Sequence, residues 1–520
     1  MRIRSLFASA LVLAVGVAVT SAAHADPLTV KTSLGKVHGK TINDAKVRAW
    51  LGIPYAAPPV GDLRWRPPQP AKKWKGVRDA ASFGAHCAQN HVFADMVFQD
   101  SGPSEDCLFL NVYAPSSAKA KANLPVMFWI HGGGYSGGAS SEPRHNGDFL
   151  PLKGVVLVTI NYRLGVFGFL VTSDLAKEGD GSAGNYGLLD MIAALRWVHN
   201  NIQKFGGDPS NVTIFGESAG SFAVSTLMAS PMAQGLFSKA IGESGGAFPS
   251  GLTLGGGTVA EDAKKGDAWA DSIGAPTLKD LRALSTDAIL ASVLKTHGNF
   301  PPDIDGRALT QPVPETYAEG KQAHVPMLAG WNLDEGSFFA MRPITVESYK
   351  KMAESFFGDR APEFLKLYPG NTDEEARRSA IDYGGDAFIA FSTWKWIEAQ
   401  CKTGDSPVYR YHFELEALPS KFHPGTFTFH SDDIEYVFGT LDTRPGWTIR
   451  PEDRVMSDQM MSYWTNFAKA GNPNGSGLPE WPAYCKDHEV MHLNNPSSAA
   501  PSTVRARYEF LLQGIPHMRF

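Results

Sequence analysis

The 520-residue sequence contains only four cysteines, and none of them forms a C-x-x-C pair or belongs to a cluster of cysteines and histidines. Zinc sites built on cysteine need such spacings, so the sequence predicts no metal site, and no motif indicates a bound cofactor. Long basic runs are also missing, since 48 lysines and arginines are outnumbered by 53 acidic residues, with a formal net charge of −5. The chain is therefore not expected to bind nucleic acid.

No internal repeat or low-complexity segment divides the chain. Hydrophobic residues make up 43% of the sequence and charged residues 19%, as in an ordinary globular protein. With 52 glycines and 35 prolines, many turns and long loops are expected. We therefore expect one interwoven domain over residues 26–520.

The first 25 residues have the pattern of a secretory signal peptide. Arg2 and Arg4 give a positive start, residues 6–19 are apolar, and Ala23-His24-Ala25 fits the small-x-small cleavage rule. The apolar run is short for a membrane-spanning helix, so we expect cleavage before Asp26 and no membrane anchor. The mature protein is expected to be secreted or periplasmic.

Export makes the four cysteines candidates for disulfide bonds, because thiols are oxidised outside the cytoplasm. Cys87 and Cys107 are close in the sequence and would close a surface loop. Cys401 and Cys485 are farther apart, and they could form a second bridge or remain two buried thiols. The sequence leaves these two alternatives open.

Strands and helices alternate through the middle of the chain. Apolar runs predict buried strands at residues 125–130, 155–160, 212–215, 239–242, 326–329 and 408–413. Between Leu188 and Phe205, apolar residues recur at three- and four-residue steps, which predicts an amphipathic helix. This alternation indicates an α/β fold whose large, mostly parallel sheet has helices on both faces. Helical segments near residues 252–322 and 341–400 are expected to form a cap over the carboxyl edge of the sheet.

The pentapeptide Gly216-Glu217-Ser218-Ala219-Gly220 joins a predicted strand to a helix-compatible stretch. A serine with glycines two residues away on either side, at such a junction, is the G-x-S-x-G nucleophile elbow. The glycines permit a tight turn that other residues would obstruct. The serine then lies at a helix N-terminus, where backbone N–H groups favour a developing negative charge. The motif predicts Ser218 as a nucleophile.

A nucleophilic serine also needs donors for the oxyanion that forms when it attacks a carbonyl group. His131-Gly132-Gly133-Gly134 directly follows the predicted strand at residues 125–130 and matches the H-G-G-G motif of lipases and esterases. Consecutive glycines let backbone N–H groups approach the substrate without interference from side chains. The backbone N–H groups of Gly133, Gly134 and Ala219 are the expected donors.

The serine must further be activated by a base, and the base must be oriented by an acid. Asp334 and Glu335 follow the strand at residues 326–329, and either could be the acid. In this type of site the chain order is serine, acid, histidine. His423 and His430 both lie in the loop after the strand at residues 408–413, so the local pattern leaves two candidate bases.

Longer motifs surround these residues. Residues 205–220 read FGGDPSNVTIFGESAG, residues 105–113 read EDCLFLNVY, and residues 52–56 read GIPYA. With these motifs the chain resembles the type-B carboxylesterase and cholinesterase-like family of α/β-hydrolases, from about residue 50 to residue 439. The resemblance implies an α/β-hydrolase fold with helical cap insertions and a serine carboxylesterase activity that needs no cofactor.

The resemblance also implies a choice between the open alternatives. Asp334-Glu335-Gly336 is similar to the family's acid loop, in which the glutamate is the triad member. His430 is placed like the family's triad histidine, whereas His423 has no such context. Ser218, Glu335 and His430 are therefore the expected catalytic triad.

Supporting roles are implied in the same way. The pair Cys87–Cys107 resembles the family's first disulfide, Ser244 corresponds to a serine near the acid, and Glu217 is expected to tune the electrostatics beside the nucleophile or to hold a water. Structural ion pairs are expected at Arg64–Glu105 and Arg163–Asp190. Cholinesterases bind choline against a tryptophan between the cysteines of the first disulfide. Residues 88–106 contain no tryptophan, which favours a general carboxylesterase.

The expected function is hydrolysis of small to medium-sized carboxylic esters to acid and alcohol through an acyl-enzyme intermediate. The expected partner is a small-molecule ester. Two alternatives use the same fold: a non-catalytic adhesion or binding protein, and an acyltransferase that uses the same triad. The sequence does not specify the physiological ester, the residues of the acyl and alcohol pockets, or the oligomeric state.

Overall fold

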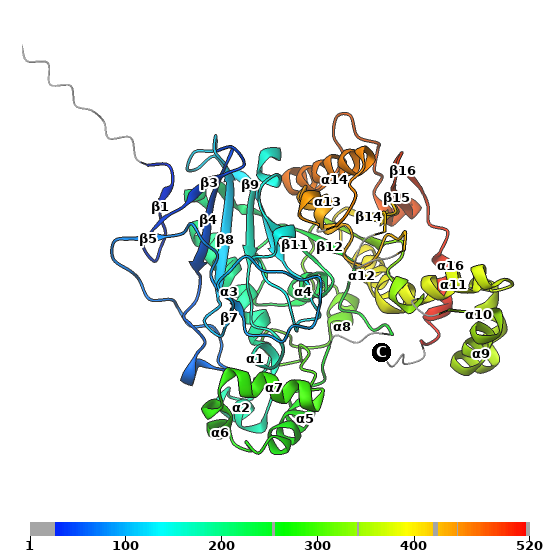
Figure 1. Cartoon of the computed structure of the whole chain (residues 1–520), viewed down its shortest axis with the longest axis horizontal. Helices are drawn as coiled ribbons and strands as arrows, with labels where there is room; N and C mark the ends of the chain where they lie inside the picture. Colours follow the sequence, from blue (N-terminus) through cyan, green and yellow to red (C-terminus); the bar gives the residue numbers. More distant parts are fainter. Residues whose placement is uncertain (1–25, 252–254, 341–342, 420–424, 445, 516–520) are drawn as a thin grey trace, which may run out of the picture.

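The computed structural model describes residues 26–251, 255–340, 343–419, 425–444 and 446–515. The expected signal peptide and His423 lie outside these residues. Within them, the core is an 11-stranded sheet with the order β16-β15-β14-β13-β12-β11-β9-β10-β8-β4-β3 (Figure 1). Its strands are β3 (Lys40–Ile42), β4 (Val47–Pro54), β8 (Phe109–Pro115), β9 (Leu124–Ile130), β10 (Val156–Ile160), β11 (Gly207–Glu217), β12 (Lys239–Glu243), β13 (Met327–Asn332), β14 (Val408–Phe413), β15 (Glu489–Leu493) and β16 (Ser498–Pro501).

The central strands of this sheet are parallel. Strands β10, β9, β11, β12, β13, β14 and β15 pair in parallel, one after another. The remaining pairs, β8 with β10, β4 with β8, β3 with β4 and β15 with β16, are antiparallel and lie toward the two edges. The predicted mostly parallel sheet is confirmed, and parallel pairing aligns the carboxyl ends of its central strands along one side.

Helices cover both faces of the sheet, which explains why its central strands are apolar without interruption. On β9, Val126, Phe128 and Ile130 pack in one core cluster, which contains residues of α3 (Tyr186–Asn201) and α4 (Ala219–Ala229). The alternate residues Met127 and Trp129 pack in a second cluster with α13 (Ile434–Phe438) and α14 (Pro451–Ala470). The strand is therefore buried from Val126 to Ile130.

Two element boundaries differ from the sequence prediction. The helix predicted over residues 188–205 ends at Asn201, and residues 202–205 form a 3₁₀ helix closed by Gly206, whose φ is +100°. The apolar period continues through this tighter turn, so the sequence pattern did not mark the change. Strand β11 begins at Gly207, before the apolar run predicted over residues 212–215, and its register shifts between Gly207 and Val212.

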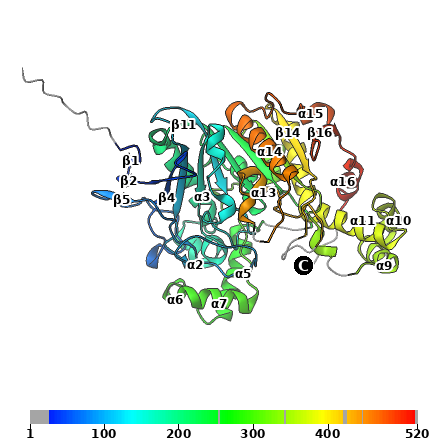
Figure 2. The same cartoon turned by 45° about the horizontal axis from the view of Figure 1, so that its top comes forward.

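The inserted segments are helical, as predicted, and form two separate groups. The first contains α5 (Val259–Ser272), α6 (Leu278–Ala283) and α7 (Thr286–Thr296), and lies at one end of the molecule beside α2 (Ser173–Glu178). The second contains α9 (Val346–Phe357), α10 (Ala361–Leu367) and α11 (Asp373–Gly385), and lies to the right in Figures 1 and 2, beyond the edge of the sheet that β15 and β16 form.

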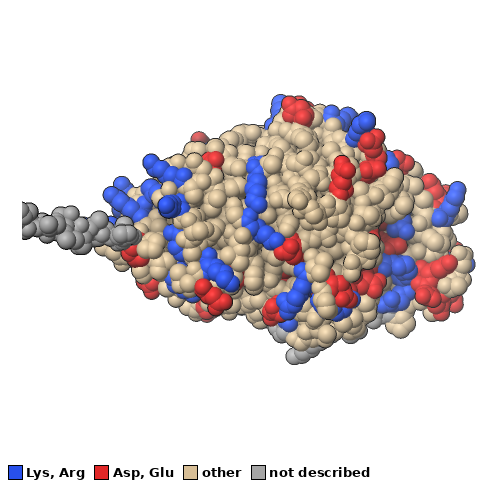
Figure 3. Space-filling model, turned by 90° about the horizontal axis from the view of Figure 1, so that it is seen from above, with Lys and Arg blue, Asp and Glu red and all other residues tan. Residues whose placement is uncertain are grey.

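Disulfides and ion pairs join distant parts of the fold. Both disulfides are formed, Cys87–Cys107 and Cys401–Cys485, and the second connects α12 (Phe391–Thr403) to α15 (Tyr484–Asp487). The ion pairs Arg64–Glu105 (2.5 Å) and Arg163–Asp190 (2.8 Å) are both present, the second fully buried and the first partly so. Among the described residues, no helix has the length and apolar character needed to span a membrane. On the face shown in Figure 3, basic and acidic side chains are interspersed.

Candidate active site

The G-x-S-x-G pentapeptide forms a sharp turn between β11 and α4. Ser218 has φ +53° and ψ −122°, a strained backbone conformation for a residue with a side chain. A Cβ on Gly216 would lie 2.6 Å from the carbonyl oxygen of Ile130, and one on Gly220 would lie 2.0 Å from the same atom. Both glycines are therefore required for the close approach of the turn to β9.

Three predicted side chains meet at this turn, although the chain separates them widely. The Ser218 hydroxyl donates to Nε2 of His430 across 2.9 Å. Nδ1 of His430 lies 2.6 Å from Oε2 of Glu335 and donates to it. Asp334, the alternative acid, contacts Arg378 and accepts a hydrogen bond from the backbone N–H of Thr428 at 3.0 Å.

The carboxylate of Glu335 is held from the side opposite His430. Its Oε1 accepts hydrogen bonds from the Ser244 hydroxyl at 2.5 Å and from the backbone N–H of Asn332 at 2.8 Å. The residue is 1% exposed, and both oxygens have donors. These donors fix the orientation of the carboxylate toward the imidazole.

Glu217 lies near the same imidazole, at the ring nitrogen that Ser218 also contacts. Its Oε1 lies 3.3 Å from Nε2 of His430, and its side chain is 4% exposed. Burial raises the pKa of Glu217 to about 8. Burial lowers the pKa of His430, but the negative charges of Glu217 and Glu335 outweigh it and raise the pKa to about 9. The two glutamates therefore stabilise the imidazolium form.

The loop after β9 runs beside the nucleophile. A Cβ on Gly132 would lie 3.2 Å from Cβ of Ser218 and 2.7 Å from Oε2 of Glu217, so only glycine permits this approach. Gly133 and Gly134 have φ values of +99° and +60°, which favour glycine. Ala219 is the first residue of α4, and the backbone N–H groups of a first helical turn have no acceptor within the helix. Gly132 of this loop and Ala219 of α4 thus both adjoin Ser218.

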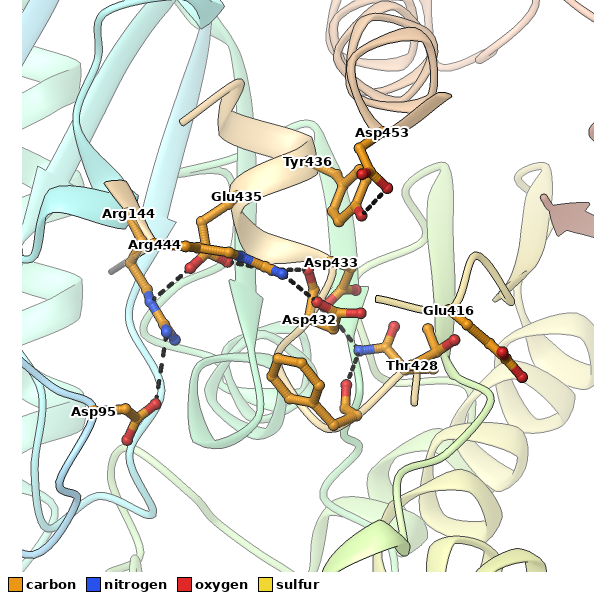
Figure 4. Close-up of polar contacts among 12 residues, drawn as sticks. Asp95, Arg144, Glu416, Thr428, Asp432, Asp433, Glu435, Tyr436, Arg444 and Asp453 are labelled. Atoms are coloured by element: carbon orange, nitrogen blue, oxygen red, sulfur yellow. Dashed lines mark hydrogen bonds and ion pairs between the residues drawn. The ribbon is translucent and has the colours of Figure 1, made fainter. Parts of the chain in front are cut away.

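A buried polar network holds the loop that carries His430 (Figure 4). The side-chain amide of Asn332 donates to the carbonyl oxygen of Phe429 at 2.9 Å and to Asp433 at 3.1 Å. Arg444 donates to the side chain and the carbonyl oxygen of Asp432 and to Glu435. The loop is therefore held on both sides of His430. Sequence reasoning did not single out Arg444, because no motif connects an isolated arginine to a histidine 14 residues earlier.

Loss of Arg444 should destabilise the protein strongly. Asp432 and Glu435 are 0% and 2% exposed, so replacing Arg444 with leucine leaves Asp432 without its cation and Glu435 with only Arg144, 3.4 Å away. We expect the free energy of unfolding in urea to fall by about 3–5 kcal/mol. Arg454→Leu, which removes an exposed ion pair with Asp442, is the control and should cost less than about 1 kcal/mol. Equal losses in the two variants would contradict the inferred role of Arg444.

Replacing Glu217 with glutamine should shift the pH dependence of the site. With His430 as the base predicted from the sequence, activity should rise as pH passes its pKa of about 9, because a base must be neutral to accept a proton. Removing the nearby negative charge lowers that pKa, and the acidic limb of the kcat/KM profile should move down by about one pH unit. Glu319 is exposed, so Glu319→Gln is the control, and the acidic limb of its kcat/KM profile should stay at the pH seen in the parent. A limb that stays fixed or moves up in Glu217→Gln would refute this assignment.

Comparisons with known proteins point to one class of enzyme. The family model of the carboxylesterase family matches residues 26–511. The fumonisin B1 esterase of Sphingopyxis macrogoltabida is 36% identical over 495 residues, covering 90% of this chain and 86% of that protein. The para-nitrobenzyl esterase of Bacillus subtilis is 35% identical over 497 residues, covering 90% of this chain and 96% of that protein.

Solved structures give the same result. The structure of a PNB esterase matches this one with a TM-score of 0.79 and 34% sequence identity. The match covers 93% of this chain and 99% of the esterase chain. A carboxylesterase of Geobacillus stearothermophilus has a TM-score of 0.80 and 32% identity, covering 92% of this chain and 99% of its own. The likeness therefore extends over nearly the whole of each chain.

Proposed function

This chain belongs to the carboxylesterase family and is an ester hydrolase, and we propose that Ser218, His430 and Glu335 carry out its reaction as nucleophile, base and orienting acid. The observation that supports this most strongly is the continuous line of hydrogen bonds from Ser218 through His430 to Glu335. It comprises a nucleophile, a base and an acid in hydrogen-bond contact, which is the arrangement needed for attack by a serine.

In the proposed mechanism, Ser218 Oγ attacks the ester carbonyl carbon while its proton moves to Nε2 of His430. The resulting imidazolium is stabilised by Glu335 through the Nδ1–H hydrogen bond. His430 then gives the proton to the leaving alcohol oxygen, and an acyl-enzyme remains on Ser218. Water attacks the acyl-enzyme with His430 again as base, which releases the acid and restores the serine.

The negative charge of each tetrahedral intermediate develops on the former carbonyl oxygen. We assign its stabilisation to the backbone N–H groups of Gly133, Gly134 and Ala219. Two observations support this: Ala219 follows Ser218 at the start of α4, and Gly132, which precedes Gly133, lies so near Ser218 that a Cβ on it would be 3.2 Å from the serine Cβ. Backbone donors of this kind are fixed before the reaction, so they need little reorganisation as the charge forms. Ser244 has an indirect role in this mechanism, because its hydroxyl holds the carboxylate of Glu335 and does not contact the substrate.

An apolar cavity of about 250 Å³ supports small to medium-sized esters as substrates. It is lined by residues that include Tyr135, next to the oxyanion loop, and Phe222 of α4, together with Phe248, Leu309 and Val313. The backbone N–H of Phe222 donates to the carbonyl oxygen of Ser218, so this wall begins one helical turn from the nucleophile. A cavity of this size and lining suits an apolar acyl or alcohol group.

The experiment that tests the proposal combines turnover with covalent labelling. We expect a panel of p-nitrophenyl esters to be hydrolysed with kcat/KM highest for short and medium acyl chains. A fluorophosphonate should abolish that activity and label Ser218, as shown by peptide mass mapping. Labelling of another residue, with activity lost, would refute the assignment of the nucleophile. The named esterases among the relatives support hydrolysis, and nothing favours an adhesion protein or an acyltransferase.

We also propose that the protein is exported and that residues 1–25 are removed before Asp26. The two disulfides support folding in an oxidising compartment. The pattern of residues 1–25, a basic start followed by an apolar run and Ala23-His24-Ala25, supports cleavage. Sequencing the N-terminus of the protein recovered from the periplasm or the medium tests the cleavage site.

A further inference from the structure

Two histidines and a glutamate converge outside the proposed active site. His412 lies on β14 and His492 on the neighbouring β15, and the two are direct partners in the parallel ladder. Glu414 follows two residues after His412, and its Oε1 lies 2.7 Å from Nδ1 of His412 and 2.5 Å from Nδ1 of His492. The proposed reaction uses none of these three residues.

The cluster is open to solvent and borders a cavity of about 250 Å³. The side chains of His412, Glu414 and His492 are 19%, 21% and 26% exposed, so an ion can reach them.

The other charged groups on this cavity have partners of their own. Arg507 forms ion pairs with Asp382 at 3.1 Å and Asp386 at 3.8 Å. The guanidinium of Arg410 stacks on Trp331 at 4.2 Å and donates to Ser502. Glu335 is held by His430, Ser244 and Asn332. The charge of Glu414 is paired instead with two imidazoles, which are themselves good metal ligands.

We propose that His412, Glu414 and His492 bind a divalent transition-metal ion, with Zn²⁺ as a fitting occupant. Two imidazole nitrogens and one carboxylate oxygen form a ligand set that zinc accepts, and the three ligand atoms lie within 4.8 Å of one another. The cavity leaves a fourth position for water. Tetrahedral zinc places its ligand atoms about 3.3 Å apart, so each imidazole nitrogen must move away from the Glu414 oxygen, now 2.7 Å and 2.5 Å away, by less than ~1 Å.

The chain forms this site from two neighbouring strands. His412 and His492 project from backbones that the ladder holds in register, and Glu414 follows at the end of β14. A bound ion would replace the hydrogen bonds of the metal-free protein and connect β14 to β15 near the edge of the sheet. Because an ion that binds the folded state stabilises it, binding should raise the melting temperature. This inference does not depend on the proposed triad.

The test uses the full mature protein without a histidine tag, treated with a chelator and then titrated with ZnCl₂ in a calorimeter. We expect one zinc ion per chain, with at least tenfold weaker binding in His412→Gln, Glu414→Gln and His492→Gln. His324 lies exposed on the surface, so His324→Gln is the first control. His430→Gln is the second, and it tests whether zinc binds at the proposed catalytic histidine instead. Both of these variants should bind zinc as the parent does.

Two further readouts keep the result interpretable if a variant is less stable. Zinc should raise the melting temperature of the parent and of His324→Gln, but not that of Glu414→Gln. Co²⁺ should give visible absorption bands typical of a low-coordinate nitrogen and oxygen site, whereas Mg²⁺ should not compete, because it prefers oxygen ligands in octahedral geometry. The proposal is wrong if the parent binds no zinc, or if folded Glu414→Gln and His492→Gln bind it as tightly as the parent.

Discussion

Replacing Ser218 with alanine should lower kcat for ester hydrolysis by roughly six orders of magnitude. The hydroxyl of Ser218 donates to Nε2 of His430 at 2.9 Å, and it is the oxygen that the proposed mechanism adds to the ester carbonyl carbon. Without it no acyl-enzyme can form, and the remaining oxyanion donors give only a small residual rate. Steady-state kinetics with a p-nitrophenyl ester, supported by an active-site titration to exclude contaminating parent enzyme, measures the loss.

The matched control is Ser221→Ala, three residues farther along α4. The hydroxyl of Ser221 is buried and donates to the carbonyl oxygen of Gly245 at 2.6 Å, away from His430. Its loss should cost some stability but leave kcat within tenfold of the parent. Retention of kcat within tenfold in Ser218→Ala would show that another group is the nucleophile.

Glu335→Gln should lower kcat by about four orders of magnitude, while its neighbour Asp334→Asn should leave kcat within tenfold of the parent. Glutamine has nearly the same shape, but it carries no charge to stabilise an imidazolium on His430. It also permits the wrong tautomer of the imidazole. Asp334 contacts Arg378 and the backbone of Thr428 instead, so its substitution should act on stability.

Each variant therefore needs two measurements, kcat and the free energy of unfolding. Asp334 is 1% exposed, and leaving its partners unsatisfied should cost about 1–3 kcal/mol of unfolding free energy in Asp334→Asn. Glu335→Gln should remain folded, with the large change confined to kcat. If Asp334→Asn lost activity as severely as Glu335→Gln, the assignment of the acid would fail.

The turn that carries Ser218 and the glycine-rich loop beside it could be predicted from the sequence because each is a contiguous motif. Gly216 and Gly220 are required by contacts with the backbone of β9 that any side chain would obstruct. Gly132 is required because a Cβ there would collide with Glu217. Such steric demands leave a visible pattern of glycines. The fold class could be predicted in the same way, since strands buried on both faces are apolar throughout.

The acid could not be chosen from local chemistry, because Asp334 and Glu335 are adjacent carboxylates in one loop. The resemblance favoured Glu335, and the contacts give the physical reason. Beyond β13 the chain turns so that the backbone N–H of Asn332 and the hydroxyl of Ser244 hold Glu335 toward His430. The same turn directs Asp334 toward Arg378.

The sequence by itself determined the class of fold, the tight turn at Ser218 and the glycine-rich loop at residues 132–134, because local backbone sterics impose those residues at fixed spacings. Only the tertiary structure decided which acid contacts the imidazole, and it alone brought His412 and Glu414 to His492, 78 or more residues away along the chain. It also revealed Arg444 between two buried carboxylates. These contacts depend on strand order and loop direction, which are set by the packing of the whole domain and leave no local pattern.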